Sequence, residues 1–224
     1  MQELPDGSIV LPQHLQYERK AMAKGRREHF TGHFVFGPNE GKAMDFESNT
    51  EFRIALVVLA RPGVVDLENQ VPFRWRDTTG KVHTHFFDFR ASQKDGSRIA
   101  IMVKAAHRLK SERLRAELAA IAAQVTPDFA DRVVIMTEKD LDPVELFNAE
   151  IVHEFRRSDP VADAAARRAV QGLVGAARIE DLVETIGLGA DGFRALVRLV
   201  GTRELELTEA VRISHDAFVR RRAA

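Results

Sequence analysis

The sequence contains no cysteine, a single tryptophan and a single tyrosine, and it has no excess of either charge. Without cysteine there can be no disulfide, thiolate zinc site or cysteine nucleophile, which fits a reducing compartment. Because 33 basic side chains balance 33 acidic ones, no global field attracts a polyanion, and any such binding must come from local clusters. No apolar run is long enough to span a membrane and the first residues do not resemble a signal peptide, so we expect a cytoplasmic protein with no membrane partner.

The residues that are present have the composition of a soluble globular protein, 45% hydrophobic and 29% charged in a chain of 224. Changes in pattern divide the chain into an N-terminal basic arm over residues 1–45, an α/β domain over 46–157 and a helical domain over 158–224. The second boundary is placed at Ser158-Asp159-Pro160, where a helical pattern breaks.

The middle segment alternates between helical and strand patterns. A helix is expected from Ser48 or Asn49 to the residue before Pro62. Three strand-like runs follow, separated by turns at Thr79-Gly80 and Asp95-Gly96, and they predict an antiparallel meander. The remaining expected elements are a helix over 110–125, a returning strand over 132–138, and a helix from Asp142 to about Phe155. The fold class expected is therefore α/β, with a mixed β-sheet flanked by helices.

The C-terminal segment shows three helical patterns, over 161–174, 179–187 and 190–200, followed by the short alternating runs RELEL and AVRIS. Three helices and a small hairpin are the order of a winged helix-turn-helix, whose third helix usually enters the major groove of DNA. Arg194 and Arg198 lie one turn apart on that helix and are predicted to contact phosphates. Two alternatives stay open: a module used for dimerisation or packing, and arginines that only solvate an exposed face.

A further basic cluster lies in the N-terminal arm and includes Arg26 and Arg27. These two residues are predicted to contact DNA, although a solvated arm has the same charge pattern.

Two charged residues stand inside strand patterns that otherwise predict burial. Asp88 lies between Phe87 and Phe89, and Lys104 follows Met102-Val103 on the next strand. A buried charge is costly unless it is paired or functional. Metal-dependent phosphodiester hydrolysis uses carboxylates to hold Mg²⁺ or Mn²⁺ and a lysine to position or activate water. A structural Asp88–Lys104 ion pair is the alternative interpretation.

From residue 30 to about 155, the order of these motifs resembles the TnsA-type transposon endonucleases, a PD-(D/E)XK family with a restriction-endonuclease-like core and a winged-helix second domain. The matching segments are Ser48-Asn49-Thr50-Glu51, Glu68-Asn69-Gln70, Asp88-Phe89, Met102-Val103-Lys104 and RVVIMTEKDLDPVELFN. The resemblance implies Glu51 and Asp88 as ligands of Mg²⁺ or Mn²⁺, with Lys104 as the catalytic lysine. It also implies double-stranded DNA as substrate and a transposase or other mobile-element protein as partner.

Met102 departs from the family pattern, which has an oxygen ligand at this position, because a thioether binds hard cations poorly. Three outcomes stay open: weaker metal binding, slower chemistry, or compensation by another acid such as Glu112. Glu51 also has a structural interpretation, since an acid in the first turn of a helix interacts favourably with the helix dipole. His83 and His85 share one strand face, opposite Asp88, and lack a third ligand at metal-site spacing.

Three functions are consistent with these residues. The first is a TnsA-like, metal-dependent DNA endonuclease of a phage or other mobile element, impaired by Met102. The second is a catalytically inactive nuclease-fold protein that binds DNA or serves as a scaffold. The third is a purely protein-binding module. The sequence leaves open whether the protein is a homodimer, and which DNA site it recognises.

Overall fold

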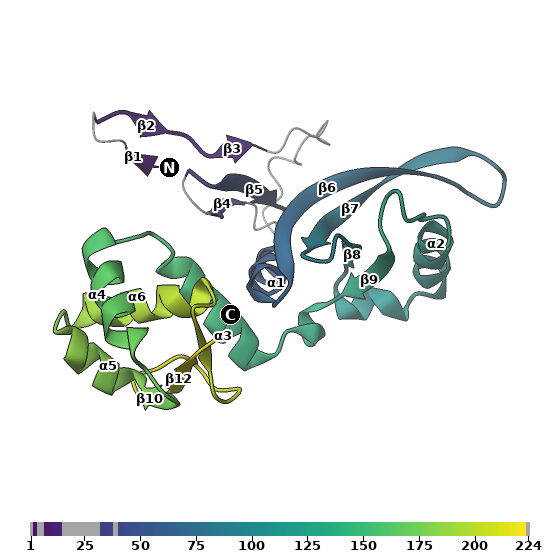
Figure 1. Cartoon of the computed structure of the whole chain (residues 1–224). Coiled ribbons are helices and arrows are strands. Elements are labelled where there is room, and N and C mark those ends of the chain that lie inside the picture. The colour runs from purple at the N-terminus through teal and green to yellow at the C-terminus, as the bar shows by residue number, and fades with distance from the viewer. Residues whose placement is uncertain (1, 4–6, 15–31, 38–39, 223–224) are drawn as a thin grey trace. The chain divides into compact units, whose positions relative to one another are not determined.

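Two compact units make up the chain, Met1–Leu141 and Asp142–Ala224. The computed structural model describes residues 2–3, 7–14, 32–37 and 40–222 (Figure 1). The division falls after Leu141, whereas the sequence pattern placed it after residue 157. The helix between these two positions, α3 (Pro143–Glu154), packs its Ile151 and Val152 against the core of the C-terminal unit.

The N-terminal unit is built on a four-stranded sheet in the order β6-β7-β8-β9. β7 pairs antiparallel with both β6 and β8, and β9 returns parallel to β8. This arrangement confirms the predicted meander and returning strand. The strands are β6 (Val64–Arg76), β7 (Val82–Gln93), β8 (Arg98–Val103) and β9 (Arg132–Met136).

The two predicted turns of the meander have the chemistry that tight turns require. Gly80 and Gly96 both adopt φ of +85°, a conformation that costs a glycine little. In the first turn the Asp77 carboxylate accepts hydrogen bonds from the backbone N–H groups of Thr79 and Lys81 at 2.8 and 3.1 Å. Asp95 makes the equivalent contact with Ser97 at 2.9 Å.

Helices α1 (Asn49–Ala60) and α2 (Glu112–Ala122) cover opposite faces of this sheet (Figure 1). Successive side chains of β8 alternate between the faces. Met102 belongs to the apolar cluster that contains Leu118 of α2, while Ile101 lines a cavity beside α1. The 3₁₀ turn Ala106–Lys110 lies after β8, at the start of the crossover to β9. A second 3₁₀ turn, Glu138–Asp140, follows β9.

Part of the expected basic arm is instead folded structure. β4 (Gly32–Phe36) and β5 (Lys42–Phe46) form an antiparallel pair, and β3 (Gln13–His14) joins β5 in parallel. Phe34, Phe36, Met44 and Phe46 are buried. The segment expected as an arm with short elements thus contains short strands over 32–36 and 42–46, whose aromatic side chains are buried. β1 (Gln2–Glu3) and β2 (Ile9–Val10) form a separate short pair.

The C-terminal unit contains the three predicted helices and a small antiparallel sheet in the order β10-β12-β11. The second hairpin strand lies at Phe218–Arg221, not within the AVRIS run at 210–214 as predicted. That run is held on α3, where Asn148 donates to the Val211 carbonyl at 2.9 Å and accepts from Ile213 N–H at 2.8 Å. The elements are α4 (Pro160–Gln171), β10 (Ala176–Arg178), α5 (Ile179–Ile186), α6 (Ala190–Gly201), β11 (Leu205–Leu207) and β12.

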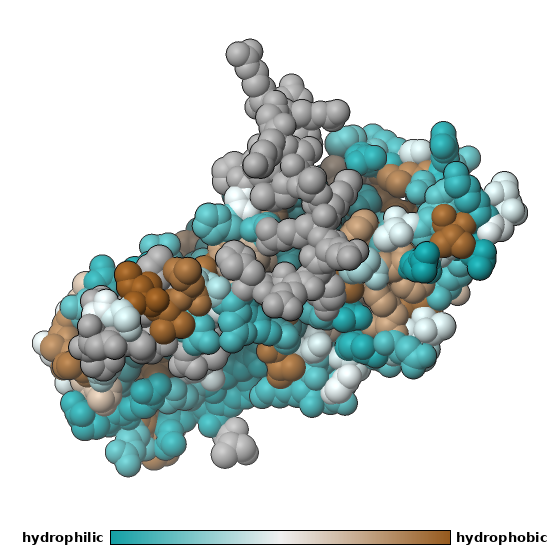
Figure 2. Space-filling view, turned by 90° about the horizontal axis from the view of Figure 1, so that it is seen from above, coloured by the Kyte–Doolittle hydropathy of each residue, from teal (hydrophilic) through white to brown (hydrophobic). Residues whose placement is uncertain are grey.

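The protein is thus mixed α/β, with a mixed sheet and six α-helices among the described residues. None of these helices combines the length and apolar character that crossing a membrane would require. The face shown in Figure 2 is largely hydrophilic, with apolar residues in separate small patches.

Candidate active site

The Asp88 carboxylate lies where the backbone pairing between β7 and β8 ends. Register pairs run from Ser92 with Arg98 to Phe89 with Ile101. Beyond Ile101, a side chain replaces the backbone partner: Oδ2 of Asp88 accepts a hydrogen bond from the Val103 N–H at 2.7 Å. The carboxylate is therefore fixed by the sheet and buried at the end of the strand pair, with 14% of the side chain exposed.

Lys104 forms an ion pair with this carboxylate. Its Nζ lies 3.4 Å from Asp88 Oδ2 and donates to the Val103 carbonyl at 2.8 Å. The backbone N–H of Lys104 donates to the Met136 carbonyl at 3.0 Å, which ties the residue to β9. Burial raises the pKa of Asp88, and the Lys104 charge and the Val103 hydrogen bond oppose that rise. The structure thus brings together two of the predicted site residues in the ion pair that was the structural alternative.

Glu51 is near this pair and also has a complete structural role. Its Oε2 accepts from the Glu47 N–H at 2.9 Å and its Oε1 from the Ser48 hydroxyl at 3.0 Å, while Ser48 Oγ accepts from the Glu51 N–H at 3.1 Å. These reciprocal contacts are of the capping-box type and stabilise the start of α1. Burial raises the pKa of Glu51, and the charge of Asp88 adds to the rise, so Asp88 lies within electrostatic reach.

Met102 is a core residue and does not face the carboxylates. Its side chain is fully buried, with 0% exposure, on the α2 face of the sheet. Residue 102 therefore cannot supply a metal ligand here for two reasons: its side chain points into the core, and its thioether binds hard cations poorly. The other buried residues of this cluster are Val71, Phe87, Ala100, Leu118, Ile121 and Ala130.

Among the described residues, no third acid joins Glu51 and Asp88. Glu112 lies in the first turn of α2 with 93% of its side chain exposed, and its nearest cation, Arg115, is 4.0 Å away. In the part of the chain that the structure describes, no group of three or more His, Cys, Asp or Glu residues is placed to hold a metal ion. Compensation for Met102 by Glu112, one outcome that the sequence left open, is therefore not supported.

A backbone distortion opposite Asp88 could not be predicted from the sequence. The pairs of Asn69 with Phe89 and of Val71 with Phe87 place Gln70 across from Asp88. Gln70 has φ of +51°, which is uncommon for any residue other than glycine. Such conformations often mark functional sites. Glutamine is not a residue type that favours positive φ, so nothing in the sequence indicated this one. Glu68, in the same motif, is instead used in an ion pair with Arg90 at 2.6 Å.

His85 is a further polar residue beside the pair. Its Nε2 is buried without a hydrogen-bond partner among the described residues, and its ring packs edge-on against Phe87 at 4.9 Å between centroids. Burial, together with the charge of Lys104, lowers the pKa of His85 to about 4. His83 has a different role, because its Nε2 lies 2.7 Å from the Asp77 carboxylate in the hairpin turn.

We expect His85 to make the N-terminal unit sensitive to acid. The unfolded chain binds a proton near pH 6.5, whereas the folded chain does so only near 4. Stability is therefore complete above pH 6.5 and is lost as the pH falls through this window, by up to about 3 kcal/mol. Urea denaturation followed by the fluorescence of Trp75, which lies in the N-terminal unit, should show a smaller loss between pH 7 and 4 in His85→Gln than in the wild type. The exposed control His107→Gln should follow the wild type; equal profiles for all three proteins would contradict the assignment.

Arg198, which was predicted to contact DNA phosphates, is largely buried in the C-terminal unit. Its guanidinium forms an ion pair with Asp163 at 2.6 Å, and only 10% of each side chain is exposed. The predicted phosphate contact is replaced by a buried structural pair that links α4 to α6. Arg194 remains half-exposed and pairs with Asp191 at 2.7 Å, one turn earlier in α6. Arg26 and Arg27 lie outside the described residues.

Helix α3 packs along the side of α6 that carries these arginines. A Cβ at Gly201 would lie 2.7 Å from Val152 Cγ1, so only glycine permits this close approach. The Phe155 ring lies 5.7 Å from the Arg194 guanidinium, and the Phe155 carbonyl accepts from Arg198 at 3.3 Å. The face of α6 that was predicted to read DNA is therefore occupied by α3 and the residue that follows it.

Comparison with known proteins adds no assignment. The sequence matches no protein-family model, and no curated protein shows significant similarity to it.

Proposed function

We propose that the protein is a DNA-processing protein with a restriction-endonuclease-like core and an impaired metal-dependent nuclease centre at Asp88, Lys104 and Glu51. The observation that carries the proposal is the largely buried Asp88–Lys104 pair at the ends of β7 and β8. The charge of Asp88 also helps to raise the pKa of Glu51, at the start of α1. A buried aspartate paired with lysine, near a second carboxylate, is the arrangement that phosphodiester hydrolysis needs. The parallel return of β9 beside the meander is compatible with such a core.

The donors suit a metal ion only in part. Glu51 and Asp88 supply two carboxylates, but both oxygens of Glu51 and one of Asp88 already accept hydrogen bonds. Mg²⁺ is commonly held by one or two carboxylates together with substrate phosphates. The centre therefore fits an ion that is completed by DNA and not a preformed metal site. When bound there, the metal would supply Lewis-acid stabilisation of the phosphate, and Lys104 would hold its charge beside it.

The C-terminal unit supports a DNA-related function by its order of elements. The succession α4, β10, α5, α6, β11 and β12, with β12 between β10 and β11, is typical of a winged helix. Because α3 packs on α6, we assign the main DNA contact to the N-terminal unit and a docking role to the C-terminal one. A transposase or another mobile-element protein is the partner class that fits this proposal.

The proposal predicts metal binding that depends on both DNA and Asp88. Titration of Mn²⁺ into the full chain should show little binding alone and clear binding with duplex DNA present. Asp88→Asn should reduce the DNA-dependent binding at least tenfold, since it removes the carboxylate that the strand ends hold in place. Asp95→Asn, in an exposed turn, is the control. Slow plasmid nicking with Mn²⁺ should disappear in the same variant.

A second candidate is an inactive nuclease-fold protein that binds DNA or serves as a scaffold. The burial of Met102 and the lack of a third acid among the described residues favour it. It predicts salt-sensitive DNA retention in EDTA that is equal in the wild type and Asp88→Asn, because phosphate contacts alone supply the affinity. Absence of DNA retention at low salt would contradict the nuclease and any DNA-binding form of the second candidate, and would favour a purely protein-binding module.

A further inference from the structure

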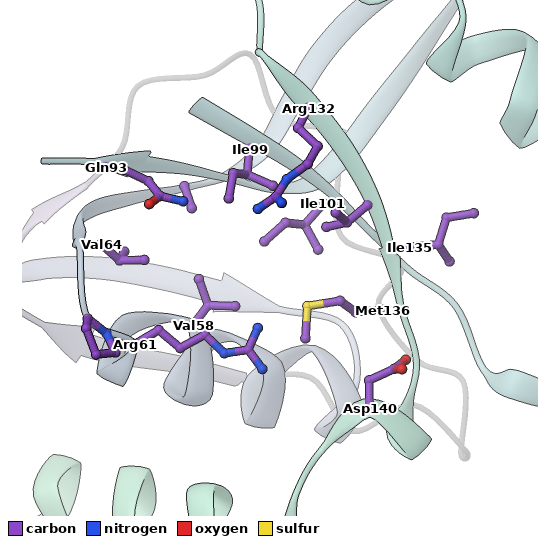
Figure 3. A pocket seen from close by; sticks show the side chains of 13 residues that line it. Val58, Arg61, Val64, Gln93, Ile99, Ile101, Arg132, Ile135, Met136 and Asp140 are labelled. Carbon is purple, nitrogen blue, oxygen red and sulfur yellow. The ribbon is translucent and has the colours of Figure 1, made fainter. Parts of the chain in front are cut away.

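A cavity of about 450 Å³ lies in the N-terminal unit, between the C-terminal end of α1 and strands β7, β8 and β9 (Figure 3). Its volume is within the range of small-molecule sites. It is distinct from the candidate nuclease centre, because Glu51 lies in the first turn of α1 and Arg61 follows its last turn. The two residues are ten positions apart in the sequence, which corresponds to about 15 Å along a helix axis.

The walls of the cavity are mainly aliphatic. Val58, Ala91, Ile101 and Met136 are almost fully buried beneath it, with 1–6% exposure. On β9 the side chains alternate, so that Arg132, Val134 and Met136 face the cavity while Val133 packs on the α2 side. An apolar floor of this kind favours a ligand with an apolar body.

Two guanidinium groups point into this apolar space from opposite sides, Arg132 from β9 and Arg61 from the end of α1 (Figure 3). The only acid among the lining residues, Asp140, accepts hydrogen bonds from the Thr137 N–H at 2.7 Å and hydroxyl at 2.8 Å. Both contacts use Oδ2 of Asp140 and cap the turn that follows β9. The cavity as a whole combines an aliphatic floor with the Arg132 guanidinium near its mouth.

We propose that this cavity binds a small amphipathic carboxylate, with its apolar body on the aliphatic floor and its head group at the Arg132 guanidinium. Guanidinium groups bind planar carboxylates through paired, charge-assisted hydrogen bonds. A nucleic-acid backbone would not use the floor, since its phosphates gain nothing from aliphatic contacts. Only a ligand with both an apolar body and a negatively charged head group can use the aliphatic floor and the guanidinium together.

The experiment is a calorimetric titration of the full chain with octanoate and, as the uncharged match, 1-octanol. Octanoate should bind the wild type at least tenfold more tightly than octanol, which corresponds to one charge-assisted contact. Arg132→Gln should weaken octanoate binding about tenfold and leave octanol binding unchanged. Arg113→Gln, an exposed arginine on α2 outside the cavity, should bind both ligands as the wild type does.

Three results would overturn the proposal: no octanoate binding, equal affinity for octanoate and octanol, or equal octanoate affinity in Arg132→Gln and Arg113→Gln. Arg132 is exposed at the surface, so its substitution is not expected to unfold the protein. The outcome is independent of DNA binding and metal binding, and so it does not depend on the proposed function.

Discussion

Met102→Glu should lower the free energy of unfolding of the N-terminal unit by about 3 kcal/mol or more at pH 7, because it would place a carboxylate without a partner in an apolar cluster. The wild-type side chain is fully buried among Val71, Phe87 and the apolar face of α2. Burial would raise the pKa of the new glutamate. The destabilisation should therefore be small below about pH 4.3 and grow as the pH rises through the raised pKa.

The measurement is urea denaturation followed by the fluorescence of Trp75, the only tryptophan, which packs against the same cluster. Met102→Leu is the matched control and should cost less than about 1.5 kcal/mol, since it preserves volume and apolar character. If Met102→Glu were instead as stable as wild type and bound Mn²⁺ more tightly, side chain 102 would reach the metal centre. In that case the ligand arrangement of the TnsA-type family would hold for this chain.

Arg198→Ala should destabilise the C-terminal unit by about 3–5 kcal/mol, because it would leave the Asp163 carboxylate buried and unpaired. The two side chains form a 2.6 Å ion pair and are each 10% exposed. Hydrogen exchange of the full chain should show faster exchange of the α4 and α6 amides, which this pair connects.

Arg194→Ala is the control, because its ion pair with Asp191 joins side chains that are 49% and 59% exposed. Exposed pairs contribute less than about 1 kcal/mol, so exchange should barely change. Replacement of both buried partners, Arg198→Met with Asp163→Leu, should recover most of the lost stability. If the amides of Arg198→Ala instead exchanged as slowly as those of Arg194→Ala while the variant lost DNA retention, the burial assignment would be contradicted. The phosphate contact predicted from the sequence would then be supported.

Local sequence signals were sufficient for most helices and strands. Ser48 and Pro62 delimit α1, and Thr79-Gly80 and Asp95-Gly96 form the two turns of the meander, because capping and turn conformations depend on a few adjacent residues. The same signals missed β12 at Phe218–Arg221, since the competing run at 210–214 is held on α3 by Asn148, a contact across more than 60 residues.

The candidate site was predictable in its residue types but not in its geometry. Charges inside apolar strand patterns identified Asp88 and Lys104, because burial of a charge requires a partner, and the structure pairs them. The distortion at Gln70 and the direction of Met102 had no such signal. Strand alternation shows that neighbouring residues point to opposite faces, but not which face meets α2 and which meets α1.

The sequence by itself determined the element order, the helix caps, the turns and the presence of two charges that burial would force together, since each depends on residues close in the chain. Only the tertiary structure decided that Met102 faces the core, that Arg198 pairs with Asp163, that α3 packs on α6, and that Arg61 and Arg132 face one cavity. These features depend on packing between segments far apart in sequence, where shape and burial choose among contacts that local patterns allow equally.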